Sequence, residues 1–384
     1  MIRRVGLGLA WIFGVAVLTV GVWMLAIGPV AVFRVITNGT TTVWDHSRYP
    51  GREISASPQP QPWATAPLDL SAVPIVIGSE TRSLDAVLQS TPTLAFVVVD
   101  RGRLVYEWYA EGHDPGTPVM SFSVTKSILG LLIGAAIDDG LIGSVTDPVS
   151  DYLPEMASGG LDRVTIEQLL TMDSGLDYVE DDNPFGKHVE FNYTPDLAAA
   201  TLALRVGSHP DDFFRYKSGD YAILGLILDR ILGETSITGY LQERLWDPLG
   251  AMDAGMWSTD AAGGLERAWC CFATSARDLA RVGQLVVDKG VWGGRQLLPV
   301  EWIDAALESA YRLSEWPVEY SDSVFTGYGY GWWEMAGGAW AGQGKGGQYL
   351  YLLPDRGLVV VRQGEASGGV SWGSVIPQAL YAIP

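Results

Sequence analysis

The chain has 384 residues, with 25 Lys and Arg residues against 44 Asp and Glu residues, so its formal net charge is −19. This length suits one large domain or two modest ones, with enough surface to bury a core. The acidic excess argues against nucleic acid as a partner, because binding a polyanion needs clustered cations. The two cysteines, Cys270 and Cys271, cannot build a disulfide framework, and a bond between such neighbours would be strained.

Lysine is a scarce residue type in this composition. The five lysines are Lys126, Lys187, Lys217, Lys289 and Lys345. Because lysines are so few, those that fall inside motifs become candidate functional cations.

The first segment of the chain predicts a membrane anchor. Residues 5–33 contain no charged residue, and roughly 20 apolar residues in a helix span a bilayer core. Arg3 and Arg4 precede the run and Arg34 follows it, so the positive-inside rule places the N-terminus in the cytoplasm and the rest of the chain outside it. A cleaved signal peptide is the alternative, although its apolar core is usually shorter, about 7–15 residues. We therefore expect one transmembrane helix within residues 1–34 and an extracytoplasmic domain.

Residues 35–71 indicate an extended linker between this anchor and the globular part. Prolines alternate with other residues in the stretch from Ser57 to Pro62, and alternating prolines favour the polyproline II conformation. The folded domain is therefore expected over residues 72–384.

The folded part begins and ends with predicted strands. Apolar runs at 94–99 and 104–109, separated by a turn, predict a β-hairpin, and runs at 348–353 and 358–362 predict another. Five helices are predicted. One follows Ser123 and one follows a capping box at Thr165–Gln168, and the others cover 221–232, 276–287 and a stretch near Val375. The sequence thus predicts an α+β domain whose antiparallel sheet comes from both chain ends, with a mostly helical region at roughly 140–320.

The motif Ser123-Val-Thr-Lys126, at the start of a predicted helix, is the first candidate site. Positions i and i+3 share one helix face, so the Lys126 amine is expected beside the Ser123 hydroxyl. A serine becomes a nucleophile when a neighbouring base takes its proton, and a lysine can do so when burial or another cation favours its neutral form. Backbone N–H groups at a helix start are also suited to binding an oxyanion.

The second motif is Tyr216-Lys217-Ser218, just ahead of a predicted helix. A tyrosine at this point can relay a proton to a leaving group if nearby lysines ionise its phenol in part. Together with Lys126, Lys217 therefore contributes to a predicted local cationic cluster within an anionic chain.

The third motif is Gly344-Lys345-Gly346-Gly347, directly before the predicted strand at Gln348. Glycines at the start of an edge strand let a substrate carbonyl approach the backbone. Lys345 can bind a substrate carboxylate or support the tyrosine, and it completes the predicted cationic cluster.

In this order, the three motifs resemble those of the penicillin-binding and β-lactamase-related serine hydrolases, whose signatures include Ser-x-x-Lys. The closer similarity is to the class C β-lactamase-like branch, which includes esterases, D-aminopeptidases and 6-aminohexanoate-dimer (nylon oligomer) hydrolases. Residues 165–178, 276–283 and 328–333 resemble that last group. The resemblance covers residues 72–384 and implies the β-lactamase-like α+β fold.

The resemblance also implies the catalytic residues. Ser123 is expected to be the acylated nucleophile, and Lys126 and Tyr216 are expected to share the general-base and general-acid work. Which of the two takes the first proton stays open.

Supporting residues are implied in the same way. The expected oxyanion hole consists of the Ser123 N–H and one N–H from the strand that follows Gly347, at Gln348. Ser218 belongs to the tyrosine motif, and Tyr178 is expected to line the pocket, as a similarly placed tyrosine does in the nylon oligomer hydrolases.

Two departures from the β-lactamase pattern narrow the expected function. Ser218 stands where β-lactamases of this type carry Asn, and Lys345-Gly346-Gly347 stands where they carry Lys-Thr-Gly. We therefore expect an esterase or a 6-aminohexanoate-oligomer-type amidase that works through an acyl-enzyme. The alternatives are a D,D-peptidase, a D-aminopeptidase, a β-lactamase-like enzyme, and, from another class, a non-catalytic peptide-binding receptor on the same fold.

The sequence predicts neither a metal nor a cofactor. The four histidines show no His-Glu-x-x-His spacing, and the two adjacent cysteines have no partner pair. The expected partners are a small ester or amide substrate and the membrane, and the residues do not indicate an oligomeric state.

Overall fold

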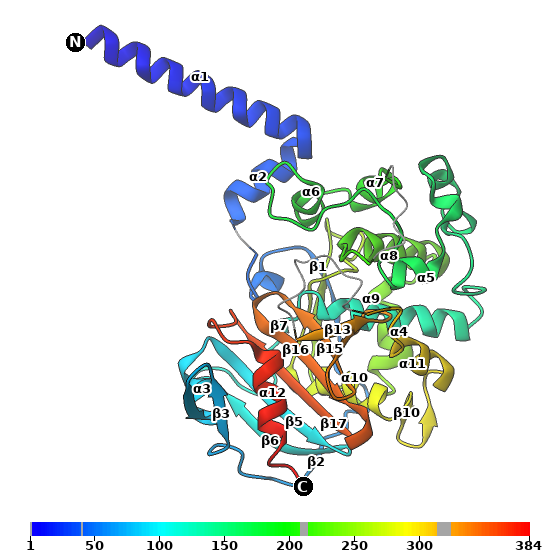
Figure 1. Cartoon of the computed structure of the whole chain (residues 1–384). Helices are drawn as coiled ribbons and strands as arrows, with labels where there is room; N and C mark the ends of the chain where they lie inside the picture. The colour runs from blue at the N-terminus through cyan, green and yellow to red at the C-terminus, as the bar shows by residue number, and fades with distance from the viewer. Residues whose placement is uncertain (1, 40, 208–213, 313–323) are drawn as a thin grey trace.

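An antiparallel sheet built from both chain ends is the centre of the computed structural model (Figure 1). The structure describes residues 2–39, 41–207, 214–312 and 324–384. Within these ranges the sheet has nine strands, in the order β12-β13-β14-β15-β16-β17-β5-β6-β2, and every pair except β2–β6 is antiparallel. The strands are β2 (Ala64–Thr65), β5 (Thr93–Asp100), β6 (Arg103–Tyr109), β12 (Tyr311–Arg312), β13 (Phe325–Tyr328), β14 (Trp333–Met335), β15 (Ala339–Gly344), β16 (Gln348–Leu353) and β17 (Leu358–Gly364). The predicted α+β fold is confirmed.

Both predicted hairpins are present, and they join the two ends of the chain. β5 pairs with β6, β16 pairs with β17, and β17 lies antiparallel to β5 with Leu358 opposite Asp100. Successive residues of β5 face opposite sides of the sheet. Val97 belongs to the core on one face and Phe96 to the core on the other. Because both faces are covered, β5 is apolar along most of its length.

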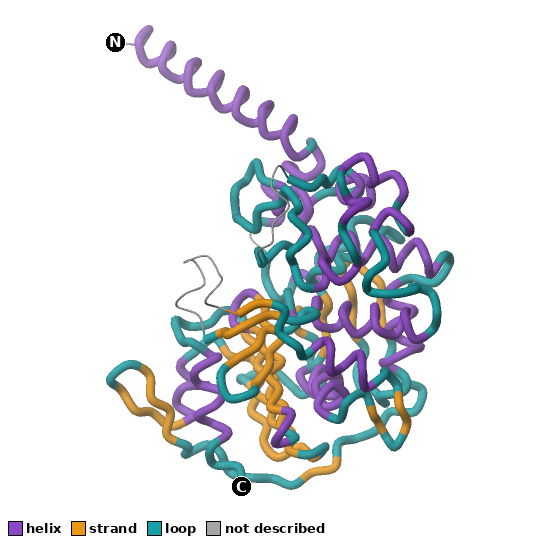
Figure 2. Tube along the Cα trace, turned by 45° about the vertical axis from the view of Figure 1, so that its right-hand side comes forward, coloured by secondary structure: helices purple, strands orange, loops and turns teal. Residues whose placement is uncertain are grey.

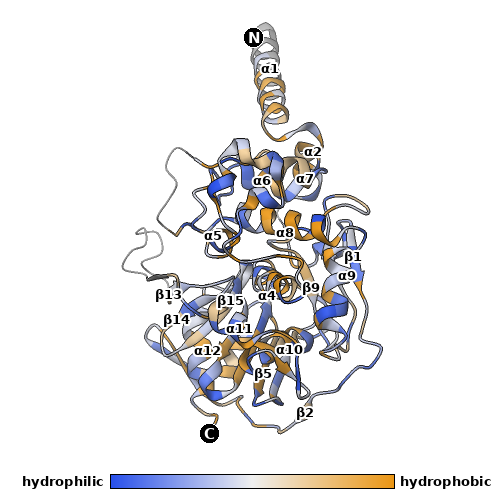
Figure 3. Cartoon of the chain, turned by 90° about the vertical axis from the view of Figure 1, so that its right-hand side faces the viewer, coloured by the Kyte–Doolittle hydropathy of each residue, from blue (hydrophilic) through white to orange (hydrophobic). Residues whose placement is uncertain are grey.

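Helices cover both faces of this sheet (Figure 2). On one face α10 (Ala276–Val287) contacts β16, β17 and β5, and α4 (Val124–Asp138) contacts β15. On the other face lie α3 (Leu84–Ser90) and α12 (Trp372–Leu380). The helix α4 runs between the sheet and α8 (Ser218–Leu232), as Figure 3 shows. It is therefore buried on almost every side.

The middle of the chain is mostly helical, as predicted, but it also contributes to a second sheet. Its further helices are α5 (Ile166–Leu170), α6 (Lys187–Tyr193), α7 (Leu197–Leu202), α9 (Ile237–Leu241) and α11 (Val300–Ala306). The predicted capping box at Thr165 and Gln168 opens α5. The second sheet has the order β1-β8-β9-β7, formed by β1 (Gly51–Ile54), β8 (Gly255–Ser258), β9 (Phe272–Thr274) and β7 (Val119–Met120). Two small hairpins complete the strands: β3 (Pro74–Ile77) with β4 (Glu80–Ser83), and β10 (Val291–Trp292) with β11 (Arg295–Gln296).

The N-terminal segment is two helices rather than the single helix that was predicted. α1 (Ile2–Ile27) projects from the body of the molecule (Figure 1), and α2 (Pro29–Asn38) begins after Gly28. Among the described residues, no single helix meets the length and hydropathy of a membrane span, whereas Val17–Ile27 and Pro29–Asn38 meet them together across a bend of 113°. The prediction of one membrane anchor helix over residues 1–34 is therefore wrong in part, because the first helix ends at Ile27 and a second begins at Pro29.

Residues 35–71, expected as an extended linker, pack along the domain. β1 pairs with β8, and β2 pairs with β6. Within the proline-rich stretch, the Gln61 N–H donates to the Gly250 carbonyl over 2.9 Å. The segment is extended in places, as its prolines indicate, but backbone hydrogen bonds tie it to the folded body.

The close packing of α4 yields a stability prediction. A Cβ added at Gly134 would overlap the indole of Trp302, whose side chain is buried. Replacing glycine by alanine in a helix gains about 1 kcal/mol of helix propensity, but overpacking a core typically costs about 1–3 kcal/mol. We expect Gly134→Ala to lower the free energy of unfolding by up to about 2 kcal/mol, measured by urea denaturation. Gly21→Ala, at a position with open space around it, is the matched control, and equal stabilities would contradict this packing.

Candidate active site

The start of α4 places Ser123 beside Lys126. The Lys126 Nζ lies 3.1 Å from the Ser123 Oγ. Phe122, directly before the serine, has a φ of +48°, a conformation that costs L-residues about 1–2 kcal/mol and that clusters at functional sites. Within the described part of the chain the Ser123 N–H donates to no acceptor. This N–H is therefore available to an oxyanion.

Lys126 is buried and makes three polar contacts. Its side chain is 1% exposed, and its Nζ donates to the Ser123 Oγ, to the Ser218 Oγ over 3.1 Å and to the Trp269 carbonyl over 3.0 Å. Burial lowers the pKa of Lys126 to about 8, although the negative charge of Glu180 acts to raise it. The amine is therefore neutral in a sizeable fraction of molecules just above neutral pH, and a neutral amine can accept the Ser123 proton.

Tyr216 lies against the same amine through the face of its ring. The Lys126 Nζ is 4.8 Å from the ring centroid, a distance at which the ring attracts a cation. Trp333 stacks on the Tyr216 ring, with 5.4 Å between ring centroids and 12° between the planes. The structure thus brings Ser123, Lys126 and Tyr216 into one cluster.

Glu180 is a residue of this cluster that the sequence analysis missed. Its Oε1 accepts from the Ser218 Oγ over 2.6 Å, and its Oε2 accepts from the Ser218 N–H over 2.7 Å. Burial acts to raise the pKa of Glu180, but hydrogen bonding and charge attraction from His188, together with Lys126, outweigh it and lower that pKa to about 2. Glu180 is therefore a fixed anion that orients the Ser218 hydroxyl, whose oxygen then accepts from Lys126.

Tyr178 lies behind the pocket rather than on its surface. Its side chain is 1% exposed, and its hydroxyl is 3.0 Å from the His188 Nδ1. The His188 Nε2 lies 3.1 Å from the Asn192 Nδ2, and its Nδ1 lies 3.5 Å from the Glu180 Oε2. Tyr178 is not among the residues that line the cavity, whereas His188, which contacts its hydroxyl, is, so the prediction that Tyr178 lines the pocket is wrong.

Lys217 points away from the predicted cationic cluster. Its side chain is fully buried, and its Nζ lies 3.8 Å from the Oδ2 of Asp220, which is also fully buried. The Asp220 Oδ1 accepts a hydrogen bond from the Ser174 Oγ over 2.5 Å. Because neighbouring residues at a helix start face different directions, Ser218 reaches Lys126 while Lys217 enters the core.

Gly347 and the Gln348 side chain of the third motif pack against the neighbouring strand β17. A Cβ at Gly347 would lie 2.8 Å from the Arg362 Nη1, and the Gln348 side chain exchanges hydrogen bonds with the backbone of Gly364. The backbone that approaches the region around Ser123 closely is that of β15, which leads into the third motif in the chain. A Cβ at Gly342 would lie 2.7 Å from the Ser127 Oγ.

The edge of β15 near Ser123 is suited to binding a substrate carbonyl. β14 pairs with β15 only as far as Ala341, so residues 342–344 lie beyond that partner strand. A Cβ at Gly344 would overlap the Ser121 carbonyl. This edge of β15 is therefore a candidate source of the second oxyanion donor, and the Gln348 N–H stays a prediction.

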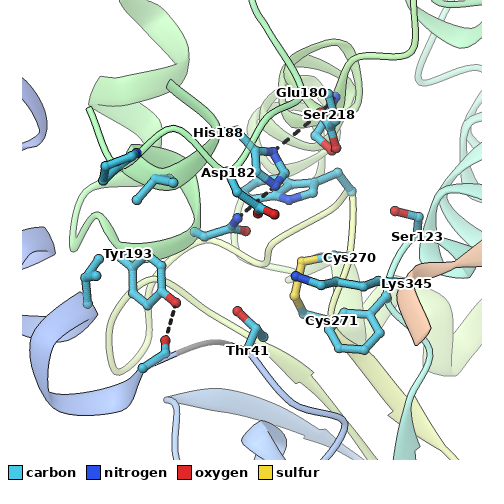
Figure 4. A pocket seen from close by; sticks show the side chains of 17 residues that line it. Thr41, Ser123, Glu180, Asp182, His188, Tyr193, Ser218, Cys270, Cys271 and Lys345 are labelled. Atoms are coloured by element: carbon cyan, nitrogen blue, oxygen red, sulfur yellow. Dashed lines mark hydrogen bonds and ion pairs between the residues drawn. A yellow bond between two sulfur atoms is a disulfide. The ribbon is translucent and has the colours of Figure 1, made fainter. Parts of the chain in front are cut away.

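A cavity of about 460 Å³ opens in front of Ser123. Figure 4 shows the disulfide-bonded Cys270 and Cys271 on one side of it, near Lys345, and His188 and Asp182 on another. The lining residues are Val35, Gly39, Thr41, Phe122, Ser123, Glu180, Asp182, Pro184, His188, Val189, Asn192, Tyr193, Ser218, Trp269, Cys270, Cys271 and Lys345. Among the described residues, no group of three or more His, Cys, Asp or Glu side chains is arranged to hold a metal ion.

Comparison with the sequences of known proteins identifies the family. The β-lactamase family profile matches residues 82–363. The chain belongs to the β-lactamase family. The 6-aminohexanoate-dimer hydrolase of Paenarthrobacter ureafaciens is 29% identical over an alignment of 308 residues that covers 74% of this chain and 76% of that protein. Family membership and this relative identify the protein as a hydrolase.

Two solved structures share the fold of this β-lactamase family member. A Bacillus anthracis protein provisionally named a 6-aminohexanoate-dimer hydrolase has a TM-score of 0.75 and 23% identity, covering 88% of this chain and 92% of its own. A D-stereospecific amidohydrolase from Streptomyces has a TM-score of 0.58 and 19% identity, covering 78% of this chain and 97% of its own. At these identities the two structures establish the fold alone.

The Glu180 carboxylate yields a pH prediction. Lys126 must be neutral to accept a proton, so kcat/KM should rise with pH through about 8. Removing the negative charge of Glu180 removes an effect that raises the pKa of Lys126. We expect Glu180→Gln to move this acid limb about one pH unit lower, measured from the pH dependence of p-nitrophenyl ester hydrolysis. Glu155→Gln, at an exposed ion pair with Arg230, is the control, and an unmoved limb in Glu180→Gln would contradict the assignment.

Proposed function

We propose that this hydrolase forms an acyl-enzyme at Ser123 and hydrolyses an ester or amide bond. The observation that carries the proposal is the contact of 3.1 Å between the Ser123 Oγ and a buried Lys126 amine whose pKa is lowered to about 8. A serine with such a base at its side, at the wall of a cavity, has the arrangement that nucleophilic catalysis requires.

In the proposed acylation step, neutral Lys126 takes the Ser123 proton while the Ser123 Oγ bonds to the substrate carbonyl carbon. The carbonyl electron pair moves to oxygen, and the resulting oxyanion is bound by the Ser123 N–H and the edge of β15. When the tetrahedral intermediate collapses, the bond to the leaving group breaks. The leaving group receives its proton from Lys126, directly or through the Tyr216 phenol.

In the proposed deacylation step, a water molecule replaces the leaving group. Lys126 takes a proton from the water as its oxygen attacks the acyl carbon, and the bond to the Ser123 Oγ breaks. The acid leaves, and Lys126 passes the proton it took from the water to the Ser123 Oγ. The cycle therefore consumes one water and needs no cofactor.

We propose a linear amide of the 6-aminohexanoate-oligomer type, or an ester of similar size, as the substrate. The name of the Paenarthrobacter ureafaciens relative supports this class, and the cavity volume lies within the range of small-molecule sites. Lys345 and Asp182 both line the cavity. They offer attraction to a carboxylate and to an ammonium group of such a substrate.

We also propose that α1 anchors the protein to a membrane, with the hydrolase domain outside the cytoplasm. The uncharged run of residues 5–33 and the arginines before it support this location. The full chain should stay with membranes washed in alkaline carbonate, whereas a chain lacking residues 1–27 should be released. Release of both the full chain and the shortened chain would contradict the proposal that α1 is a membrane anchor.

The nucleophile has a direct test. We expect Ser123→Ala to lose at least 1,000-fold in p-nitrophenyl ester hydrolysis, on the order found when a catalytic nucleophile is removed, and to lose labelling by a fluorophosphonate probe. Thermal unfolding of the variant checks that it is folded. Ser127→Ala, one turn further along α4, is the matched control for labelling. A folded Ser123→Ala variant that keeps its activity would refute the proposal.

The substrate class is tested with a panel of esters, linear 6-aminohexanoate amides, D-amino-acid peptides and nitrocefin. We expect turnover of an ester or a linear amide that depends on Ser123. Preferential turnover of D-peptides, with penicillin acylating Ser123, would favour a peptidase instead. No labelling and no turnover in the wild type would favour a binding protein.

A further inference from the structure

The wall of the cavity contains a disulfide between neighbours in the sequence. Cys270 and Cys271 are bonded through their sulfurs, and both line the cavity that Ser123 faces (Figure 4). Their sequence context alone indicates no role for this pair. The two cysteines directly follow Trp269, whose carbonyl accepts a hydrogen bond from Lys126, and directly precede β9.

The Trp269 carbonyl determines where the Lys126 amine points. A protonated lysine has three N–H donors, whereas the neutral amine has two donors and one lone pair. The two donors are taken by the Trp269 carbonyl and by the Ser218 Oγ. The lone pair is then left to face the Ser123 Oγ, the third partner of the amine.

The backbone that carries this carbonyl takes an unfavourable conformation. Cys271 has a φ of +74°, in the left-handed region that side chains disfavour and glycine tolerates. A bond between the sulfurs of adjacent residues closes a small ring around their shared peptide, so the ring restrains the backbone of both. This ring is a restraint that can offset the cost of the left-handed conformation at Cys271.

Both ends of the segment are held in place by other parts of the fold. The Trp257 Nε1 donates to the Cys270 carbonyl over 3.1 Å, and the Ser258 N–H donates to the Cys271 carbonyl over 3.1 Å. The next residue, Phe272, donates its N–H to the Thr125 Oγ1 on α4 over 3.2 Å. The two cysteines therefore lie between the Trp269 carbonyl and Phe272, whose N–H is hydrogen-bonded to α4, the helix that carries Lys126.

We propose that the Cys270–Cys271 disulfide is a positioning element of the active site, which holds the Trp269 carbonyl toward Lys126 by keeping Cys271 in the left-handed conformation. This inference rests on the proposed function of Ser123 and Lys126. It assigns to the two cysteines an effect on the reaction that acts through the backbone rather than through contact with the reacting atoms.

The test compares two full-length variants that differ only at residue 271: Cys270→Ala/Cys271→Ser and Cys270→Ala/Cys271→Gly. Both lack the disulfide, but only glycine adopts a φ of +74° without steric cost. The first readout is the titration of Lys126 by NMR of ¹³C-labelled lysine, which is practicable because the chain has five lysines. The second is the pH profile of p-nitrophenyl ester hydrolysis, and thermal unfolding confirms that each variant is folded.

Losing the Trp269 acceptor removes a hydrogen bond that favours the charged amine, so the serine variant should titrate Lys126 at a lower pH than the wild type. Its kcat/KM should fall on the order of tenfold to a hundredfold, the range produced by small misplacements of catalytic groups. In the glycine variant, both the pH at which Lys126 titrates and kcat/KM should lie close to the wild-type values. Reducing the wild type with a phosphine should reproduce the serine variant and leave both variants unchanged.

Two results would overturn the proposal. One is a Lys126 titration that is the same in the oxidised wild type, the reduced wild type and the serine variant. The other is an equal shift in the serine and glycine variants, because the backbone of Cys271 would then not be the cause. A failure of the proposed function gives a different result: fluorophosphonate labelling that does not depend on Ser123, while the Lys126 titration still responds to the disulfide.

Discussion

The burial of one amine at the start of α4 determines how the rest of the site is arranged. Lys126 is 1% exposed, and desolvating a lysine favours its neutral form. A neutral amine needs partners that fix its direction, and Ser218 and the Trp269 carbonyl supply them. Glu180 orients Ser218 from behind and limits the fall in the pKa of Lys126. Each neighbour of the amine thus controls either its charge or its direction.

The cavity in front of this amine is assembled from distant parts of the chain. Val35, Gly39 and Thr41 of the N-terminal segment line it together with residues of α6 and of the loop before β9. Arg34 on α2 holds this arrangement, because its Nη1 donates to the Tyr193, Thr194 and Asp260 carbonyls. The N-terminal segment is therefore a wall of the cavity as well as a connection to α1.

Features that depend on local sequence could be predicted. The hairpin of β5 and β6 follows from two apolar runs around a turn, and α10 matches the predicted helix at 276–287. The nearness of Ser123 and Lys126 follows from helix geometry, since residues three apart share a face. The single helix expected over residues 1–34 is interrupted at Gly28, where the backbone takes a φ of +87° that hydropathy does not reveal.

The site residues that the sequence failed to predict, or predicted wrongly, share a common physical cause. Glu180 is 38 residues from Ser218 along the chain, and the Trp269 carbonyl is 143 residues from Lys126, so no local pattern indicates either contact. Carbonyl groups occur in every residue, and a sequence cannot show which of them will face an amine. The direction of Lys217 into the core, and the place of Tyr178 behind His188, likewise depend on how α8 and α6 pack.

By itself, the sequence determined the family resemblance, the α+β class and the serine–lysine pair, because these depend on residue identity, short spacing and local periodicity. Only the tertiary structure decided which groups surround that pair. The charge and direction of the Lys126 amine depend on burial and on partners that folding brings from distant segments, and the same folding places a disulfide of two adjacent cysteines beside the nucleophile.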